Sequence, residues 1–271
     1  MATPAEKVAT FRAAHRPGQP LLLANAWDIG SARFLAGLGF AALATTSSGF
    51  AATLGRRDYK VTRDEALTHA AALVGAIDLP LSADLENCFA DEPARAAETV
   101  TAAVAIGLAG CSIEDFTSSA AGPIYDIGLA TERVAAAAEA AHREGDFVLT
   151  ARAENFLHGR TDLADTILRL QRYGEAGADV LYAPGLVTID DIRAVVTAVG
   201  KPVNVLTVPG IPSVAELAEA GVARISVGGA FAFVALGAVA RAGRELLEQG
   251  TYGWLEVAGE SRRVVATAFE T

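Results

Sequence analysis

Short runs of apolar residues alternate along the chain with longer Ala- and Leu-rich stretches in which apolar residues recur with a helical period. Such alternation is typical of a parallel sheet covered by helices. The predicted helices cover roughly residues 31–38, 63–77, 93–106, 131–144, 162–176, 188–199, 213–220 and 230–249. The predicted strands are Leu21–Trp27, Ala42–Ser47, Leu79–Leu85, Ala109–Glu114, Phe147–Ala153, Val180–Ala183, Pro202–Val208 and Arg224–Val227.

The number of units and the chain length together indicate a fold. Eight strand–helix units in 271 residues match a (β/α)8 barrel, which typically needs about 250 residues. No GxGxxG or GxxxxGK[ST] motif follows the first strand, which argues against a doubly wound nucleotide-binding sheet. No linker divides the chain. We therefore predict an α/β protein with one TIM-barrel domain over residues 1–271.

Composition and charge narrow the functional classes. The 52% of apolar residues exclude a disordered chain, and the net charge of −10 argues against nucleic-acid or anionic-membrane binding. The two cysteines, Cys88 and Cys111, form no CxxC pair, which argues against a disulfide framework or a structural zinc site. The longest uncharged run, 16 residues between Arg224 and Arg241, is too short for a membrane span, and no secretory signal is recognisable. We expect a soluble, cytoplasmic protein.

Polar side chains gather at the ends of the predicted strands, where a barrel carries its chemistry. A single polar residue there could cap a helix, but a ring of them around one rim indicates a site. The ring contains Asn25, Asp28, Thr46, Ser47, Ser48, Asp84, Glu86, Asn87, Glu114, Asp115, Arg152, Glu154, Asn155, Tyr182, Asn204 and Ser226.

Three carboxylates of this ring suggest a metal site. Asp84 and Glu86 lie two residues apart and so face the same side of a strand, and Glu114 ends the neighbouring strand. Three close carboxylates repel one another unless a divalent cation neutralises them, and oxygen ligands suit Mg²⁺ or Mn²⁺. In the alternative interpretation Asp84 caps a helix, while Glu86 and Glu114 pair with surface Arg or Lys. The spacing of these residues alone does not decide between the metal site and this alternative.

Two further features of the rim suit an anionic ligand. The predicted turn Ser47–Gly49 offers hydroxyl and amide groups to a carboxylate or phosphate oxygen, although such a sequence is also ordinary loop chemistry. Arg152 presents a planar fork that matches a carboxylate, and its alternative is a salt bridge to Glu154 or Asp115.

The histidines add little to the predicted site. His15, His69 and His142 are expected to be solvated, and His158 follows the fifth strand within possible reach of the site. The apolar stretch Phe231–Ala240 suggests a helix that is covered by a partner surface.

Taken in order, five motifs resemble those of the isocitrate lyase/phosphoenolpyruvate mutase superfamily. They are Thr46–Gly49 (TSSG), Leu81–Asn87 (LSADLEN), Ser112–Asp115 (SIED), Thr150–Glu154 (TARAE) and Asn204–Gly210 (NVLTVPG). The resemblance implies a (β/α)8 barrel in a homo-oligomer, a dimer or tetramer, in which the C-terminal helical region of about 230–271 packs on a neighbouring subunit. It also implies Mg²⁺ held directly by Asp84, with Glu86 and Glu114 bound mostly through water.

The same resemblance implies roles for other residues. Asp58 is similar to an additional acid near the metal, Arg152 would brace the reacting end of the substrate, and Ser48, Gly49 and Phe50 would hold its carboxylate. The further substrate-binding candidates are Trp27, Ser47, Asp84, Glu154, Asn204 and Pro209.

The chain departs from the superfamily in one loop. Isocitrate and methylisocitrate lyases carry a Lys-Lys-Cys-Gly-His segment after the fourth strand, and here residues 117–126 hold no Cys, Lys or His. The Lys and Asn of the mutase gating loop are also missing. Asp58, Tyr125 and Asp126 are the candidates for the absent acid/base.

Three functions are compatible with these residues. The favoured one is an Mg²⁺-dependent lyase that cleaves a carbon–carbon bond of, or decarboxylates, a small 2-oxo or 2-hydroxy carboxylate through an enolate, giving a pyruvate-like product. The second is a phosphonopyruvate or carboxyphosphonoenolpyruvate mutase or hydrolase. The third is a catalytically silent barrel that binds a 2-oxo acid.

Overall fold

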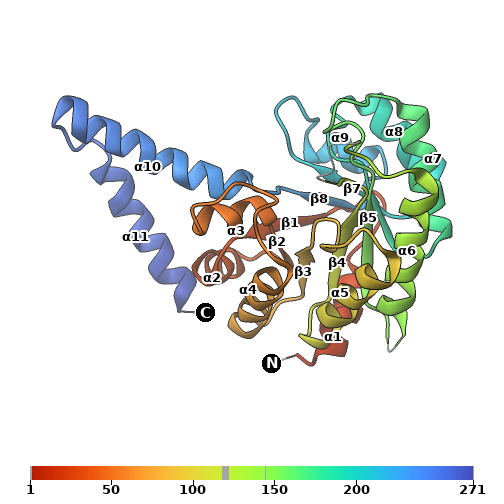
Figure 1. The fold of residues 1–271 in the computed structure, drawn as a ribbon. Helices are drawn as coiled ribbons and strands as arrows, with labels where there is room; N and C mark the ends of the chain where they lie inside the picture. Colours follow the sequence, from red (N-terminus) through yellow and green to blue (C-terminus); the bar gives the residue numbers. More distant parts are fainter. Residues whose placement is uncertain (1, 118–121, 144, 271) are drawn as a thin grey trace.

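Eight parallel strands close into a barrel in the computed structural model, which describes residues 2–117, 122–143 and 145–270 (Figure 1). Each strand pairs with the next along the chain, and β1 pairs with β8 to complete the ring. The (β/α)8 fold is confirmed. The strands are β1 (Leu21–Ala26), β2 (Leu43–Thr45), β3 (Leu81–Asp84), β4 (Gly110–Glu114), β5 (Val148–Arg152), β6 (Val180–Tyr182), β7 (Val203–Leu206) and β8 (Arg224–Ser226).

Helices surround the strands, and their apolar faces form the main core against the outer face of the barrel. The helices α1 and α3 are not predicted by the sequence pattern, because each is short and neither has a clear apolar stripe. The eleven helices of the described residues are α1 (Pro4–Ala13), α2 (Ile29–Gly37), α3 (Ser47–Thr53), α4 (Arg63–Ala76), α5 (Pro93–Ala105), α6 (Ile127–His142), α7 (Leu163–Glu175), α8 (Ile189–Val199), α9 (Val214–Glu219), α10 (Ala230–Gln249) and α11 (Leu255–Phe269).

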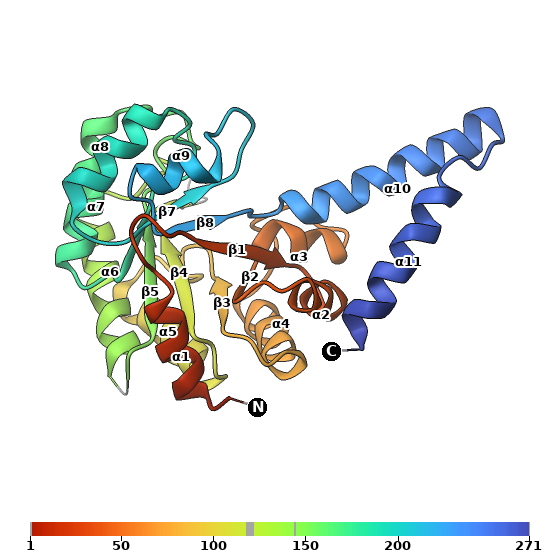
Figure 2. The same cartoon turned by 180° about the vertical axis from the view of Figure 1, so that it is seen from behind.

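The helix α1 closes one end of the barrel (Figure 2). Phe11 is fully buried and packs with Leu21, Val148 and Val180, which open β1, β5 and β6, in a small second core. Apolar side chains therefore fill this part of the N-terminal end of the barrel.

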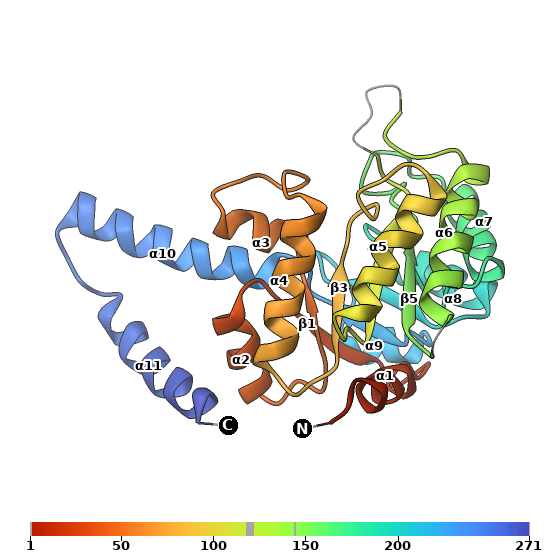
Figure 3. The ribbon, with the colours of Figure 1, turned by 60° about the horizontal axis from the view of Figure 1, so that its bottom comes forward.

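The last two helices form an arm that stands away from the barrel (Figure 3). After β8, α10 projects outward, and α11 turns back until its end packs on α2, where Gly37 leaves room for the backbone of Ala268. Exchange of this region between subunits stays a prediction, since the structure contains one chain. Among the described residues, no helix is long and apolar enough to cross a membrane.

His15 lies just after α1 and is buried, so the expectation of a solvated side chain is wrong. Its Nδ1 is 2.8 Å from the Phe11 carbonyl oxygen, and its Nε2 is 3.1 Å from Nη1 of Arg224. Burial, together with the Arg224 charge, lowers the pKa of His15 to about 3. The ring is thus neutral in the folded protein, and its Nε2 accepts from Arg224.

This predicts an acid-labile component of stability. Between its folded pKa of about 3 and its unfolded pKa of about 6.5, His15 binds a proton only when unfolded, so stability falls as the pH drops through that range. His15→Gln keeps a neutral acceptor and removes this component. Between pH 7 and pH 4.5, we expect the wild type to lose about 1–3 kcal/mol more unfolding free energy than the variant in urea titrations. Equal losses in the two proteins would contradict the assignment.

Candidate active site

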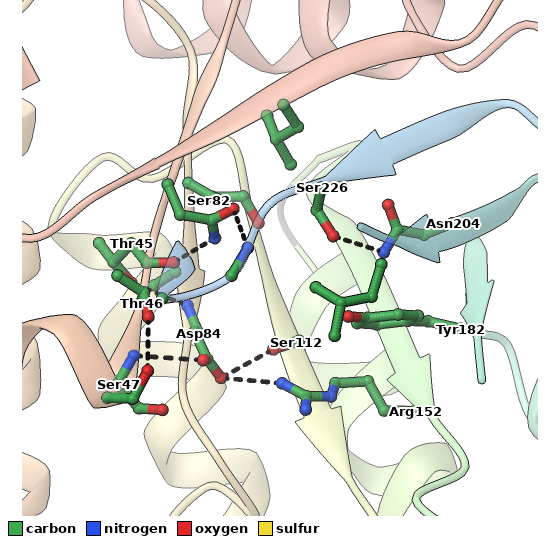
Figure 4. Close-up of a pocket in the computed structure, with 18 of the residues that line it drawn as sticks. Thr45, Thr46, Ser47, Ser82, Asp84, Ser112, Arg152, Tyr182, Asn204 and Ser226 are labelled. Carbon is green, nitrogen blue, oxygen red and sulfur yellow. Dashed lines mark hydrogen bonds and ion pairs between the residues drawn. The ribbon is translucent and has the colours of Figure 1, made fainter. Parts of the chain in front are cut away.

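A cavity of about 240 Å³ lies within the barrel at the C-terminal ends of its strands (Figure 4). Its polar side chains come from the strands and from the segments that follow them, including α3 and the loop after α3. The polar side chains of the lining are Asn25, Thr45, Thr46, Ser47, Ser48, Asp58, Tyr59, Ser82, Asp84, Ser112, Arg152, Tyr182, Asn204, Arg224 and Ser226.

Arg152, the last residue of β5, joins three carboxylates, which come from β3, β4 and the loop after β5. Its Nε donates to Oε1 of Glu154 at 2.7 Å, its Nη1 donates to Oδ1 of Asp84 at 3.2 Å, and its Nη2 is 3.2 Å from Oε2 of Glu114. The salt bridge to Glu154 is therefore present, and it is one of three. Since each Nη atom carries two hydrogens, Arg152 keeps donors for a ligand in the cavity.

The other partner considered for Arg152 is engaged elsewhere. Asp115 is buried and lies 3.1 Å from Nη1 of Arg169, and it accepts a hydrogen bond from Tyr173 at 2.6 Å. It also accepts from the backbone N–H of Glu154 at 2.8 Å, which fixes the loop after β5. Asp115 thus has a structural role beside the site.

The carboxylates around Arg152 carry more negative charge than one guanidinium balances. Burial raises the pKa of Glu114 well above its usual range and also raises that of Glu154, and Arg152 offsets this only in part. Oε1 of Glu114 and Oε2 of Glu154 are buried without a hydrogen-bond partner among the described residues. Free acceptors of this kind indicate a place for a further cation or proton.

Asp84 is the carboxylate that faces the cavity, between Ser47 on one side and Ser112 and Arg152 on the other (Figure 4). Its Oδ2 accepts from the backbone N–H of Ser47 at 3.2 Å, and its Oδ1 accepts from the Ser112 hydroxyl at 3.4 Å. Its own N–H donates to the Thr45 hydroxyl at 2.9 Å. These contacts fix the Asp84 carboxylate toward the lumen.

Glu86 follows Asp84 in a left-handed backbone conformation, with φ of 50°, and neighbouring Cys88 and Phe89 share that conformation. Burial, Asp84 and Asp58 raise the pKa of Glu86 to about 8, and its Oε1 has no hydrogen-bond partner within the described part of the chain. A residue other than glycine adopts this backbone only at a cost of about 1–3 kcal/mol, a form of strain that clusters at functional sites. The strain here holds a carboxylate beside Asp84.

These acids fit a hard cation held partly through water. In the ranges that the structure describes, no group of three or more His, Cys, Asp or Glu side chains lies close enough to ligate one ion directly. Asp84 and Asp58 line the cavity, while Glu86 and Glu114 are buried outside its lining, each with one oxygen that has no hydrogen-bond partner among the described residues. An all-oxygen set with one direct ligand is typical of Mg²⁺, which keeps several waters. Both Glu86 and Glu114 are buried, so the alternative of surface ion pairs is wrong.

The predicted Ser47–Gly49 turn is the first turn of α3. Thr46 caps this helix by accepting from the N–H of Gly49 at 3.3 Å, and Ser48 contacts the Thr46 hydroxyl at 3.2 Å. Ser47 and Ser48 line the cavity. Gly49 packs so closely on Thr46 and Trp27 that a Cβ would lie 2.5 Å from the Thr46 methyl carbon.

Asp58 and Asn204 also line the cavity. Burial and the charge of Asp84 raise the pKa of Asp58 above its ordinary value. Asn204 donates to the Ser226 hydroxyl at 2.9 Å on the far side of the cavity from Ser47.

Several predicted site residues lie outside the cavity lining. The Tyr125 hydroxyl donates to Asp91 and accepts from Asn87 at 2.9 Å, and burial raises its pKa. Segment 118–121 of the same loop lies outside the described residues. The others that the lining does not contain are Trp27, Gly49, Phe50 (stacked on His69 at 3.8 Å), Glu86, Glu114, Glu154 and the exposed Pro209.

Five polar residues of the lining are absent from the predicted ring and from the other predicted site residues: Thr45, Tyr59, Ser82, Ser112 and Arg224. Tyr59 adopts φ of 60°, and its hydroxyl hydrogen-bonds Glu114, which a loop position alone does not reveal. Arg224 starts β8, and the signal was available, because a charged residue two before Ser226 must share its face of the strand.

A sequence model of phosphoenolpyruvate phosphomutase matches residues 11–247. The chain belongs to the phosphoenolpyruvate phosphomutase family. The family lies in the isocitrate lyase/phosphoenolpyruvate mutase superfamily of lyases and mutases, which supports an enzymatic function.

Named relatives of this family member are diverse. Among solved structures, a Burkholderia cenocepacia J2315 protein, provisionally described as a lyase/mutase, is 50% identical, with a TM-score of 0.93 and coverage of 96% of this chain and 95% of its own. A provisional phosphonomutase from the same organism is 40% identical, with a TM-score of 0.84 and coverage of 92% and 100%. The 2-methylisocitrate lyase of Escherichia coli K12 is 29% identical over 201 residues, 71% of this chain and 67% of that one.

A glycine at the start of α10 provides a test of the site's packing. A Cβ at Gly229 would collide with the Ser48 hydroxyl and lie 2.9 Å from the Phe233 ring. Gly229→Ala should therefore displace Ser48 and lower stability by about 1–3 kcal/mol in thermal or urea denaturation. The matched control is Gly75→Ala in α4, where nothing lies within 4 Å of the added Cβ. An equal effect of the two substitutions would show that Ser48 is not held as described.

Proposed function

We infer that this family member is a lyase that uses Mg²⁺ to cleave a carbon–carbon bond of, or decarboxylate, a small 2-oxo or 2-hydroxy carboxylate. The observation that carries the proposal is Arg152 held by three carboxylates beside a small polar cavity. A guanidinium fixed in this way stabilises negative charge that develops on a bound oxygen during bond cleavage.

The acids of the site and Arg152 would have different roles in this reaction. Asp84 would hold the metal directly, with Glu86 and Glu114 behind water, and Mn²⁺ would suit the same oxygen ligands. When bound, Mg²⁺ supplies a positive charge that polarises a chelating carbonyl or hydroxyl oxygen. Arg152 would donate its remaining N–H groups to the oxygen that becomes an enolate. Its attachment to Glu154 and Glu114 keeps it in place, so little reorganisation is needed in the transition state.

Substrate binding and proton transfer fall to the residues around the cavity. Ser47 and Ser48, which line the cavity, would receive the carboxylate, while Gly49, outside the lining, would support the turn. Asp58 is the acid/base that the cavity favours, because its raised pKa suits proton exchange and it lines the lumen. Tyr125, whose hydroxyl is bonded to Asp91, would need to move to take that role.

The second candidate is a mutase or hydrolase acting on a phosphonate. The observation favouring it is the 40% identity to a provisional phosphonomutase. The same Arg152 and Asp84 would serve it, since an enolate is stabilised in the same way whichever group departs. The third candidate is a catalytically silent barrel that binds a 2-oxo acid. It would show saturable binding of that acid and form no product.

Turnover assays test the lyase proposal. We expect pyruvate or a related product from at least one of malate, isocitrate, methylisocitrate or oxaloacetate with Mg²⁺, and no turnover with EDTA. Asp84→Asn and Arg152→Met should each lower kcat/KM by about 10²–10³-fold, because each removes charge stabilisation from the transition state. Asp190→Asn, an exposed substitution in α8, is the control. Retained activity in either site variant would refute the assignment, and turnover of phosphonopyruvate alone would select the mutase or hydrolase.

The proposal includes a homo-oligomer, a dimer or tetramer, in which the arm of α10 and α11 packs on a neighbouring subunit. Large apolar side chains are exposed along α10, including Val234, Val239 and Leu247, the last of them 87% exposed. Contiguous exposed apolar surface of this kind marks a protein–protein interface.

Charges placed on the arm should dissociate the oligomer. Val239→Asp with Leu247→Asp should shift the sedimentation coefficient to that of a 27.9 kDa monomer. The control is Arg244→Asp, which changes a polar position of the same helix. A wild-type protein that sediments as a monomer at all concentrations would disprove this part of the proposal.

A further inference from the structure

The cavity contains a second arginine at its closed end. Arg224 is the first residue of β8, and its side chain is buried, yet it lines the same cavity as Asp84. Because side chains alternate along a strand, Arg224 and Ser226 both point into the barrel. A permanent cation thus lies at the bottom of the proposed active-site cavity.

Every partner of the Arg224 guanidinium is uncharged. Its Nε donates to Oδ1 of Asn204 at 2.9 Å, its Nη2 donates to the Thr150 hydroxyl at 3.0 Å, and its Nη1 donates to Nε2 of the neutral His15 at 3.1 Å. Across residues 2–117, 122–143 and 145–270, no carboxylate lies within ion-pair distance of it. Buried charges are normally paired, so this arrangement lacks its counter-charge.

A comparison with the other buried arginines sharpens the point. Arg169 pairs with Asp115 at 3.1 Å, while Arg133 donates to three main-chain carbonyl oxygens in the closed core. Arg224 differs from both, because it borders an open cavity and its three contacts leave one N–H free on each Nη atom. Because Arg224 borders the lumen, its unused N–H groups can donate to the oxygens of a carboxylate bound there.

Arg224 lies within reach of a ligand held at Asp84. Thr150, which contacts the guanidinium, pairs in register with Ser112, and Ser112 pairs with Asp84. Arg224 and Asp84 also line the same cavity of about 240 Å³. A short organic acid bound there can therefore hydrogen-bond to protein groups at both of its ends.

The polar groups beside Arg224 are uncharged and hydrogen-bond to one another. Asn204 donates its Nδ2 hydrogen to Ser226, so its Oδ1 is turned to Arg224. Ser226 in turn hydrogen-bonds the Tyr182 hydroxyl, and burial raises the pKa of Tyr182 to about 12, so that this hydroxyl keeps its proton. The closed end of the cavity therefore repels cations and favours an anion.

We propose that Arg224, with Ser226 and Tyr182, forms an anion-binding floor beneath the Asp84–Arg152 site. Its ligand is a carboxylate-like oxyanion that comes either from the far end of a dicarboxylic substrate or from a small free anion. The first source rests on the proposed function, since the substrate's other end is then held at Asp84. The second source, a small free anion, does not rest on the proposed function.

Matched ligands separate the two sources. With Mg²⁺ present, calorimetry should give a dissociation constant for 2-oxoglutarate at least about tenfold below that for 2-oxovalerate, which has the same chain length and no second carboxylate. Arg224→Met should abolish the difference and leave 2-oxovalerate binding unchanged. For a free anion, sodium formate should raise the melting temperature of the wild type above that in sodium chloride at equal ionic strength, and the effect should vanish in Arg224→Met.

Each outcome decides between the possibilities. Loss of the diacid preference in Arg224→Met assigns the floor to the substrate, and a formate effect without that preference assigns it to a free anion. If neither effect appears while 2-oxovalerate binds, the floor is disproved and the proposed function stands. If formate stabilises the wild type and neither 2-oxo acid binds, the floor stands and the proposed function fails. Arg224→Lys keeps the charge without the fork and retains part of either effect, so the test does not depend on the folding of Arg224→Met.

Discussion

The interaction on which the site depends is the attachment of one guanidinium to carboxylates from two strands and from the loop after a third. Arg152 can hold Asp84, Glu114 and Glu154 together only because β3, β4 and β5 are adjacent and in register, so that residues far apart in sequence end at one rim. The same attachment leaves orphan acceptors on Glu114 and Glu154. The site is therefore assembled with surplus negative charge, a condition that a cation or a proton relieves.

Much of this arrangement could be predicted from sequence. The alternation of apolar runs and helical stretches predicted the barrel. A barrel places the residues at its strand ends, such as Asp84 and Arg152, at one rim, so their position followed from the fold. Arg152 could be expected to form ion pairs with carboxylates, because the charge of a semi-buried arginine in such a ring requires an anionic partner. The motifs around Asp84 and Glu114 led to the family to which the chain belongs.

Other features depend on contacts that no local pattern encodes. His15 was expected in solvent, and its burial comes from α1 closing the barrel and meeting Arg224. The Ser47–Gly49 segment was expected as a turn, and it is helical because Thr46 caps it. Tyr125 and Phe50 lie near the site in sequence, yet their side chains are engaged with Asp91 and His69 instead. In each case a tertiary partner determined the outcome.

The closure of the barrel floor has a consequence for biosynthesis. His15 and Arg224, which meet there, are 209 positions apart, and β1 must pair with β8 before the ring exists. During translation the first helix leaves the ribosome long before its partner strand is made. The lumen therefore cannot acquire its shape until β8 has emerged, and until then β1 has an unpaired edge.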